Sequence, residues 1–175
     1  MVKVFIGVLV ATITLIVVFQ FIDPNINTGG ISTSLVDSNS ISVSISGEVV
    51  RSGTYLLDKN TALFDLIEAC GGVTSNADEN AYDTSYLLQD GYSFYIAPKY
   101  DNSDVCSLEP IEKVNINKDD AETMSKISGI GSTIATAIVN YRNDNGSFGR
   151  IEDIKNVNGI GNATFEKVKN YITIK

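Results

Sequence analysis

The C-terminal third of the chain contains one short sequence motif twice, and the second copy begins thirty residues after the first. Ile127–Gly131 reads Ile-Ser-Gly-Ile-Gly, and Val157–Gly161 reads Val-Asn-Gly-Ile-Gly. Apolar residues recur at the same offset on both sides of the motif; the pairs are Ala121/Ile151, Met124/Ile154, Ala135/Phe165, Ile138/Val168 and Tyr141/Tyr171. This spacing predicts two copies of one unit, in which a Gly-apolar-Gly turn joins two short apolar helices.

The two glycines of each turn are expected to have different tasks. The first takes a backbone conformation that a side chain opposes, and the second lets a phosphate approach the backbone closely. The Ile between them points into the core and anchors the turn. The N–H groups at the start of the next helix then face outward, where the partial positive charge of a helix N-terminus favours an anion. Such amides contact phosphates and no base edge, so the predicted nucleic-acid binding is independent of base sequence.

The net charge of −8 is distributed unevenly along the chain. Residues 1–110 hold 4 basic and 13 acidic side chains, a net charge of −9, whereas residues 111–175 hold 9 and 8, a net charge of +1. The repeat region is therefore close to neutral and lacks the wide basic surface of strong DNA binders. Nucleic-acid binding is expected to depend on local backbone geometry, with a modest contribution from charge.

The residue types disfavour catalysis. The chain has no His, which is the commonest general base and zinc ligand, and no Walker-type or dinucleotide motif. We therefore expect no enzyme activity, no catalytic residue, no cofactor and no metal. The acidic pairs Asp119-Asp120 and Glu152-Asp153 are interpreted as solvated acids in the first turns of helices, rather than as metal ligands of a nuclease. Cys70 is expected to be a small buried residue and Cys106 to be free in a linker; the alternative is a disulfide between them outside the cell.

The N-terminal segment is expected to be a membrane anchor. Val4–Ile22 holds no charged residue, and a helix of this length spans about 28 Å, close to the roughly 30 Å of a hydrocarbon core. No small-residue cleavage site follows it. Lys3 precedes the segment and Asp23 follows it, so the positive-inside rule places the N-terminus in the cytoplasm and the rest outside the cell. Residues 23–40, rich in Asn, Ser, Thr and Gly, are expected to be a flexible spacer.

Residues 41–98 are expected to form a small folded domain with strands on both sides of one helix. Alternating apolar and polar residues indicate half-buried strands, and two glycines after the helix indicate its end. The expected elements are strands at Ile41–Gly47, Thr54–Leu57, Tyr82–Leu88 and Tyr92–Ile96, the last two as a hairpin, and a helix at Ala62–Ala69 capped by Thr61. This order predicts a small β-grasp-like α+β fold.

The remaining segments are assigned by composition and pattern. Residues 99–112 are expected to be an acidic linker, and residues 113–175 to be an all-α repeat domain. Asn117 is expected to cap a helix that starts at Lys118. Phe148, in the loop between the copies, is expected to fill the gap between them.

Residues 41–98 resemble a known family. The residues that carry the resemblance are Val43–Val50, the Gly53-Thr54-Tyr55 turn, the Ala69–Val73 helix end and the Asp90-Gly91 turn, which are similar to those of the SLBB domain. Ser52 stands where that family commonly has Pro. The resemblance implies an exported protein that binds a soluble ligand, surface polysaccharide or copies of itself.

The doubled Gly-Ile-Gly turn resembles the tandem helix-hairpin-helix family, (HhH)₂. With Val114–Asn117, Ala121-Glu122 and Val139–Arg142, and with an anchor, spacer and SLBB-like unit ahead, the chain is similar to competence DNA receptors of the ComEA family. The family often has Lys where this chain has Ile134 and Ala163. Cations near the turns are Lys126, Arg142, Lys167 and Lys169.

The resemblance implies a single-pass cell-membrane protein whose extracellular hairpins bind double-stranded DNA for uptake in natural transformation. The SLBB-like domain would contact other copies or an uptake channel. The alternative is a surface-anchored SLBB polysaccharide-binding or scaffolding protein, in which the helix-hairpin-helix pair is a structural module. The predicted DNA-binding residues are Gly129, Ile130, Gly131, Ser132, Gly159, Ile160, Gly161, Asn162, Lys126 and Lys167.

Overall fold

The computed structural model describes residues 39–101 and 109–175, and these residues belong to one compact unit. The predicted anchor at residues 4–22 and Cys106 lie outside the described residues. Within the described ranges, no helix is long and apolar enough to cross a membrane. Cys70 is fully buried and its thiol donates to the carbonyl of Ile67 at 3.1 Å, as a small buried residue would.

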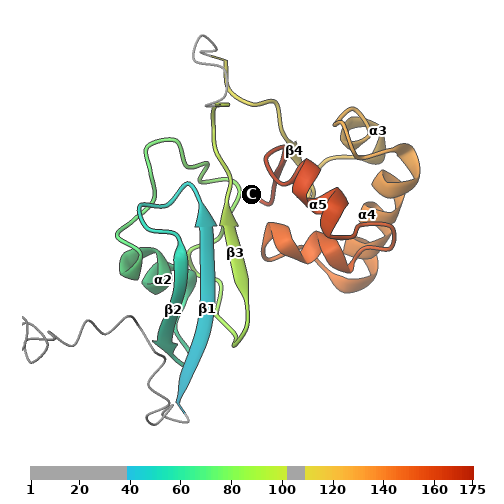
Figure 1. The fold of residues 1–175 in the computed structure, drawn as a ribbon. Coiled ribbons are helices and arrows are strands. Elements are labelled where there is room, and N and C mark those ends of the chain that lie inside the picture. The colour runs from blue at the N-terminus through green and yellow to red at the C-terminus, as the bar shows by residue number, and fades with distance from the viewer. Residues whose placement is uncertain (1–38, 102–108) are drawn as a thin grey trace, which may run out of the picture. The chain divides into compact units, whose positions relative to one another are not determined.

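The first domain is a three-stranded sheet with one helix. Its elements are β1 (Ser40–Gly47), β2 (Gly53–Asp58), α2 (Leu63–Ala69) and β3 (Ser93–Ile96). The strand order is β2-β1-β3, and β1 pairs antiparallel with β2 and parallel with β3 (Figure 1). Alternate residues of β1 are buried together with one face of α2, as the predicted period of two requires. The fold is the predicted small α+β unit.

The predicted hairpin at residues 82–96 is wrong. Residues 82–88 form no strand, and β3 pairs with β1 instead. The carbonyls of Thr84 and Tyr86 accept from the first amides of α2, Phe64 and Leu63, both at 2.9 Å. Because the first amides of a helix need acceptors from outside the helix, residues 82–88 supply carbonyls to α2 and do not pair with a neighbouring strand.

The predicted cap of α2 is also wrong. The carboxylate of Asp65 accepts from the Ala62 amide at 2.7 Å, while the Thr61 hydroxyl donates backwards to the carbonyl of Asp58 at 2.8 Å. A carboxylate in the first turn is favoured by the helix dipole, and it takes the place that we assigned to Thr61.

The second hydrophobic core lies in the repeat domain, residues 113–175. The elements are β4 (Val114–Asn115), α3 (Ala121–Met124), α4 (Ser132–Asn145), the 3₁₀ helix η1 (Ile151–Asn156), α5 (Asn162–Val168) and β5 (Ile172–Thr173). Apolar residues at equivalent places in the two copies are buried in one cluster, including Met124 with Ile154 and Ile138 with Val168. Phe148 is buried and its ring stacks on Tyr141 at 5.1 Å, so it fills the gap between the copies as predicted.

Two details of this domain differ from the prediction. The parallel pairing of β4 with β5 joins its two ends, so the domain is not purely helical. Asn117 caps no helix; its side chain bonds to both backbone groups of Phe148 and to the carbonyl of Ile174. Asp120 is the cap of α3 and accepts from the Thr123 amide at 2.7 Å.

Candidate nucleic-acid interface

The two Gly-Ile-Gly hairpins have the same backbone course. Gly129 and Gly159 have φ of 100° and 92°, a conformation that L side chains rarely adopt. The amide of Ile130 donates to the carbonyl of Ile127 at 3.0 Å, and the amide of Ile160 to that of Val157 at 3.1 Å. Both isoleucines are buried. The expected roles of the first Gly and the Ile are therefore confirmed.

The second glycine of each hairpin lies in a different setting. Gly131 has φ of −76° and Gly161 has φ of −93°, values that any residue adopts. A Cβ at either position would meet no heavy atom within 4 Å. Neither the backbone conformation nor the packing of the protein therefore requires glycine at Gly131 or Gly161.

These second glycines are also the N-cap residues of α4 and α5, and neither helix has a side-chain cap or an acidic residue in its first turn. The neighbouring α3 has both, Asp120 as cap and Glu122 in the turn. Because the first amides of a helix have no partner inside the helix, the hairpins present them outward. Ser132 and Asn162, the first residues of the two helices, are exposed beside them.

Each hairpin rests on the second helix of the other copy. A Cβ at Gly129 would lie 3.0 Å from Val168 Cγ1 and 3.7 Å from Lys167 Cβ. A Cβ at Gly159 would lie 3.8 Å from Ile134 Cγ1. Lys167 therefore belongs with the first hairpin, although it follows the second in the sequence. No local pattern indicated this exchange.

Two of the four candidate cations have structural partners. The guanidinium of Arg142 donates to the carbonyl of Ile116 at 2.8 Å. Lys169 pairs with Glu166 at 2.6 Å, and its ammonium lies 4.1 Å from the centre of the Tyr95 ring.

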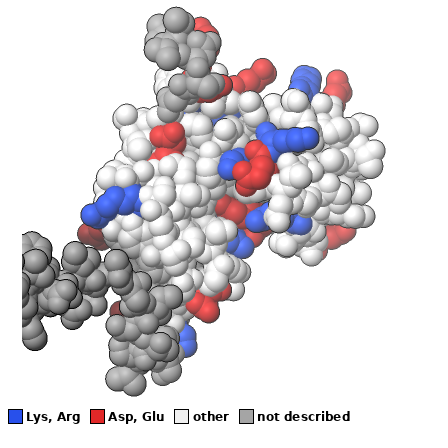
Figure 2. Space-filling model, in the orientation of Figure 1, with Lys and Arg blue, Asp and Glu red and all other residues white. Residues whose placement is uncertain are grey.

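Lys126 and Lys167 are exposed. On the face that Figure 2 shows, basic and acidic side chains alternate and form no continuous basic area. Since Arg142 and Lys169 have structural partners, Lys126 and Lys167 are the candidate cations that remain for a phosphate backbone, and the charge they offer is modest.

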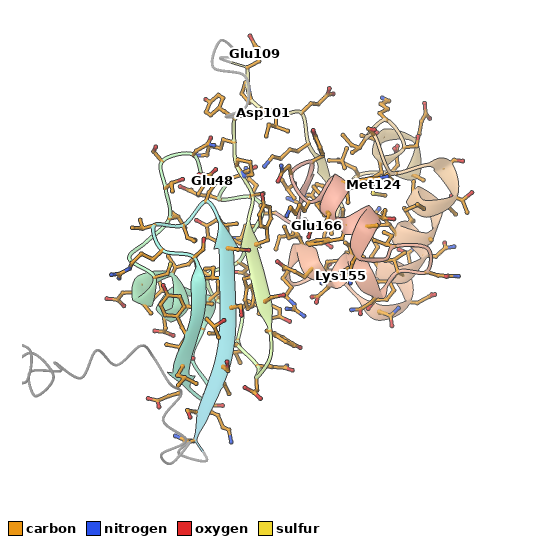
Figure 3. All side chains as sticks on the ribbon, viewed as in Figure 1. Glu48, Asp101, Glu109, Met124, Lys155 and Glu166 are labelled. Atoms are coloured by element: carbon orange, nitrogen blue, oxygen red, sulfur yellow. The ribbon has the colours of Figure 1, made fainter. Side chains whose placement is uncertain are left out.

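A hollow adjoins each hairpin. The one beside the first hairpin has a volume of about 330 Å³ and is lined by Lys126, Ile127 and Ser128 together with the acidic residues Asp101, Glu109 and Glu112. The one beside the second has about 130 Å³ and includes Asn162, and also Lys155 of η1 and Glu166 of α5, both labelled in Figure 3. Carboxylates beside both hairpins limit how strongly a polyanion is attracted.

The acids that we weighed as metal ligands all have protein partners. The bonds join Asp119 to the Asn115 amide, Asp120 to the Thr123 amide, Glu152 to the Tyr95 amide and Asp153 to Arg150. Glu152 is 5% exposed, so its interpretation as a solvated acid is wrong. In the described part of the chain, no three His, Cys, Asp or Glu are grouped to hold a metal ion.

Known proteins share both domains. The family model of the helix-hairpin-helix motif matches residues 109–173, and that of the SLBB domain matches residues 42–94. The chain is 37% identical over 147 residues to ComE operon protein 1 of Bacillus subtilis, an alignment that covers 79% of this chain and 72% of that protein.

Two shorter matches cover about a third of this chain each. One is an uncharacterized protein of Haemophilus influenzae, 44% identical over 62 residues, with 35% of this chain and 55% of that protein covered. The other is endonuclease/exonuclease/phosphatase family domain-containing protein 1 of Homo sapiens, 36% identical over 58 residues, with 33% and 10% covered. Only the match to the Bacillus subtilis protein extends over most of both chains among these three.

Proposed function

We propose, since the chain belongs to the family of ComE operon protein 1, that it binds double-stranded DNA through its two hairpins without base specificity. The hairpin amides of Gly131, Ser132, Gly161 and Asn162 contact phosphates, with charge from Lys126 and Lys167. The protein is a binding protein and no enzyme. Its role is that of a receptor that holds DNA for uptake in natural transformation.

The observation that carries this proposal is the second glycine of each hairpin. Gly131 and Gly161 have ordinary φ values and open space where a side chain would stand. Both begin a helix that has neither a cap nor an acid in its first turn. Close approach of an external anion to the backbone explains glycine, the missing cap and the missing acid together. That the arrangement occurs twice fits a ligand with regularly spaced phosphates.

The setting of the hairpins outside the cell is part of the same proposal. The uncharged stretch at residues 4–22 is the membrane anchor, and Lys3 on its N-terminal side supports a cytoplasmic N-terminus. Binding by one protein molecule is weak because few cations face the phosphates. Several anchored protein molecules on one DNA molecule compensate for this weak affinity. Once the first has bound, binding of the next is effectively intramolecular.

A direct test is a gel shift of residues 37–175 with random-sequence duplex across a salt series. This fragment is preferable to residues 111–175, because the buried pair of Lys113 with Asp78, 2.6 Å apart, joins the two domains. We expect binding at low salt with a slope of log K against log salt of about −2 to −4, as two to four phosphate contacts predict. If tens of micromolar protein cause no shift of the duplex, the proposal is wrong.

A double variant tests whether the hairpins make the contact. Gly131→Val with Gly161→Val places a side chain at both points of approach and should abolish the shift. The matched control is Gly53→Val, because Gly53 lies in β2 and a Cβ there has only an ordinary contact at 3.8 Å with Tyr55. DNA binding that survives in the folded double variant would show that the hairpins are not the binding site.

One observation favours the alternative function. Four of the large apolar side chains that stand exposed among the described residues belong to the SLBB-like domain: Val50, Leu56, Phe64 and Leu87. Exposed apolar side chains of this size are available for a contact with another molecule, and they mark a binding surface where they adjoin one another. If the gel shift fails, the proposal becomes a scaffolding or polysaccharide-binding protein in which the SLBB-like domain is the working part.

A further inference from the structure

The edge of the sheet is closed by two side chains rather than by a strand. β3 has β1 on one side and no strand on the other within the described residues. On that open side the guanidinium of Arg150 donates to the carbonyl of Ser93 at 3.3 Å, and the carboxylate of Glu152 accepts from the Tyr95 amide. Residues 93 and 95 are the ones whose backbone groups point away from β1, so Arg150 and Glu152 offer the donor and acceptor that a neighbouring strand would offer.

Further contacts hold this pair against the sheet. The Arg150 guanidinium lies 3.7 Å from the centre of the Tyr92 ring. The ring of Tyr86 covers Gly149, where a Cβ would lie only 2.4 Å from a ring carbon. The Tyr95 hydroxyl donates to the side chain of Asn170 at 2.7 Å. The contact between the SLBB-like domain and the second helix-hairpin-helix copy is therefore close-packed as well as hydrogen-bonded.

Glu152 is buried at the centre of this contact, and its equivalent in the first copy, Glu122, is exposed. Burial raises the pKa of Glu152 to about 7, and the amides of Glu152 and Tyr95 and the charge of Arg150 only partly oppose it. The other charged or titratable groups on the packed elements are Asp153 and Lys155 of η1, Glu166 of α5 with the adjoining Lys169, and Tyr95 of β3 with the nearby Glu48 after β1.

We propose that Arg150 and Glu152 form a proton-linked latch that holds the SLBB-like domain against the second helix-hairpin-helix copy. Protonated Glu152 keeps its acceptor for the Tyr95 amide without the cost of a buried charge. Charged Glu152 pays that cost and weakens the contact. Because the docked carboxyl binds its proton more tightly than a solvated one, the latch is strongest in acid and loosens as pH rises through about 7.

The latch concerns both domains. Asn162 of the second hairpin lines the same hollow as Glu152, Ser93 and Tyr95. When the latch is closed, the second hairpin therefore has a fixed position relative to the sheet. A molecule bound by the SLBB-like domain is then also at a fixed distance from that hairpin. The latch itself requires no DNA and is tested without it.

The test is hydrogen exchange of the full chain in detergent, read at the Tyr95 amide at pH 6 and pH 8 and corrected for the intrinsic effect of pH on exchange. A carboxyl with a docked pKa near 7 predicts a protection factor about tenfold lower at pH 8. Glu152→Gln keeps an acceptor and has no charge, so the drop should vanish. Glu122→Gln, the matched control in the first copy, should keep it.

A second variant covers the case in which Glu152→Gln does not fold. Arg150→Gln removes the charge that favours ionised Glu152, so the pH at which protection drops should move upward. The proposal is overturned if the wild-type chain shows no drop or if folded Glu152→Gln keeps it. It is also overturned if, over a series of pH values, protection in Arg150→Gln levels off at the same pH as in the wild-type chain.

Discussion

The two glycines of one hairpin are expected to respond in opposite ways to the same substitution. Gly129 has φ of 100°, and a Cβ there would lie 3.0 Å from Val168 Cγ1. The backbone conformation alone costs a side chain about 1–2 kcal/mol, and the tight contact adds to this. Gly129→Ala should therefore lower the free energy of unfolding by about 1–3 kcal/mol.

Gly131→Ala should leave stability almost unchanged and weaken DNA binding. Gly131 has φ of −76° and no heavy atom within 4 Å of a Cβ. The loss of a favourable N-cap and the gain from a stiffer unfolded chain are each about 0.5–1 kcal/mol and of opposite sign, so stability changes by about 0.5 kcal/mol or less. The methyl group stands where a phosphate approaches, and we expect affinity for duplex DNA to fall about tenfold, or by roughly 1.4 kcal/mol.

Thermal unfolding and fluorescence anisotropy with a labelled duplex separate the two effects on residues 37–175. The midpoint should fall by roughly 3–12 °C for Gly129→Ala and hardly move for Gly131→Ala. The second copy is an internal control, because a Cβ at Gly159 meets only Ile134 at 3.8 Å and should cost less than at Gly129. Wild-type affinity in Gly131→Ala, or wild-type stability in Gly129→Ala, would refute the division of roles.

Three other substitutions test the remaining assignments. Lys113→Ala leaves Asp78 buried without its partner and should cost about 3–5 kcal/mol in denaturant unfolding; a smaller loss than 1 kcal/mol would argue against a buried pair. Arg142→Gln removes the bond to the Ile116 carbonyl and should lower stability by about 1.5–3 kcal/mol while the salt slope of DNA binding stays the same. Lys126→Gln should do the reverse, reducing the magnitude of that slope by about 1 with no change in the unfolding midpoint; an unchanged slope would remove Lys126 from the interface.

Local pattern was sufficient for the architecture of the repeat. The apolar period identified most of the buried residues of both copies, because a helix must turn its apolar face to the core; Tyr171 is an exception and is exposed. The Gly-Ile-Gly motif predicted a positive φ at Gly129 and Gly159, since chirality restricts which residues adopt it. Alternation likewise predicted the buried face of β1. These are properties of a segment and its nearest neighbours, so the sequence alone determined them.

Contacts between remote segments were decided by the tertiary structure. Residues 82–88 have the residue types of a strand, yet their carbonyls serve the N-terminus of α2. Lys167 lies beside the first hairpin because each hairpin rests on the other copy's second helix. Glu122 and Glu152 occupy equivalent places in the repeat. Of the two, Glu152 packs against the edge of β3 and is buried, whereas Glu122 is exposed. A repeat in the sequence predicts equal local structure, whereas burial and charge depend on what packs against each copy.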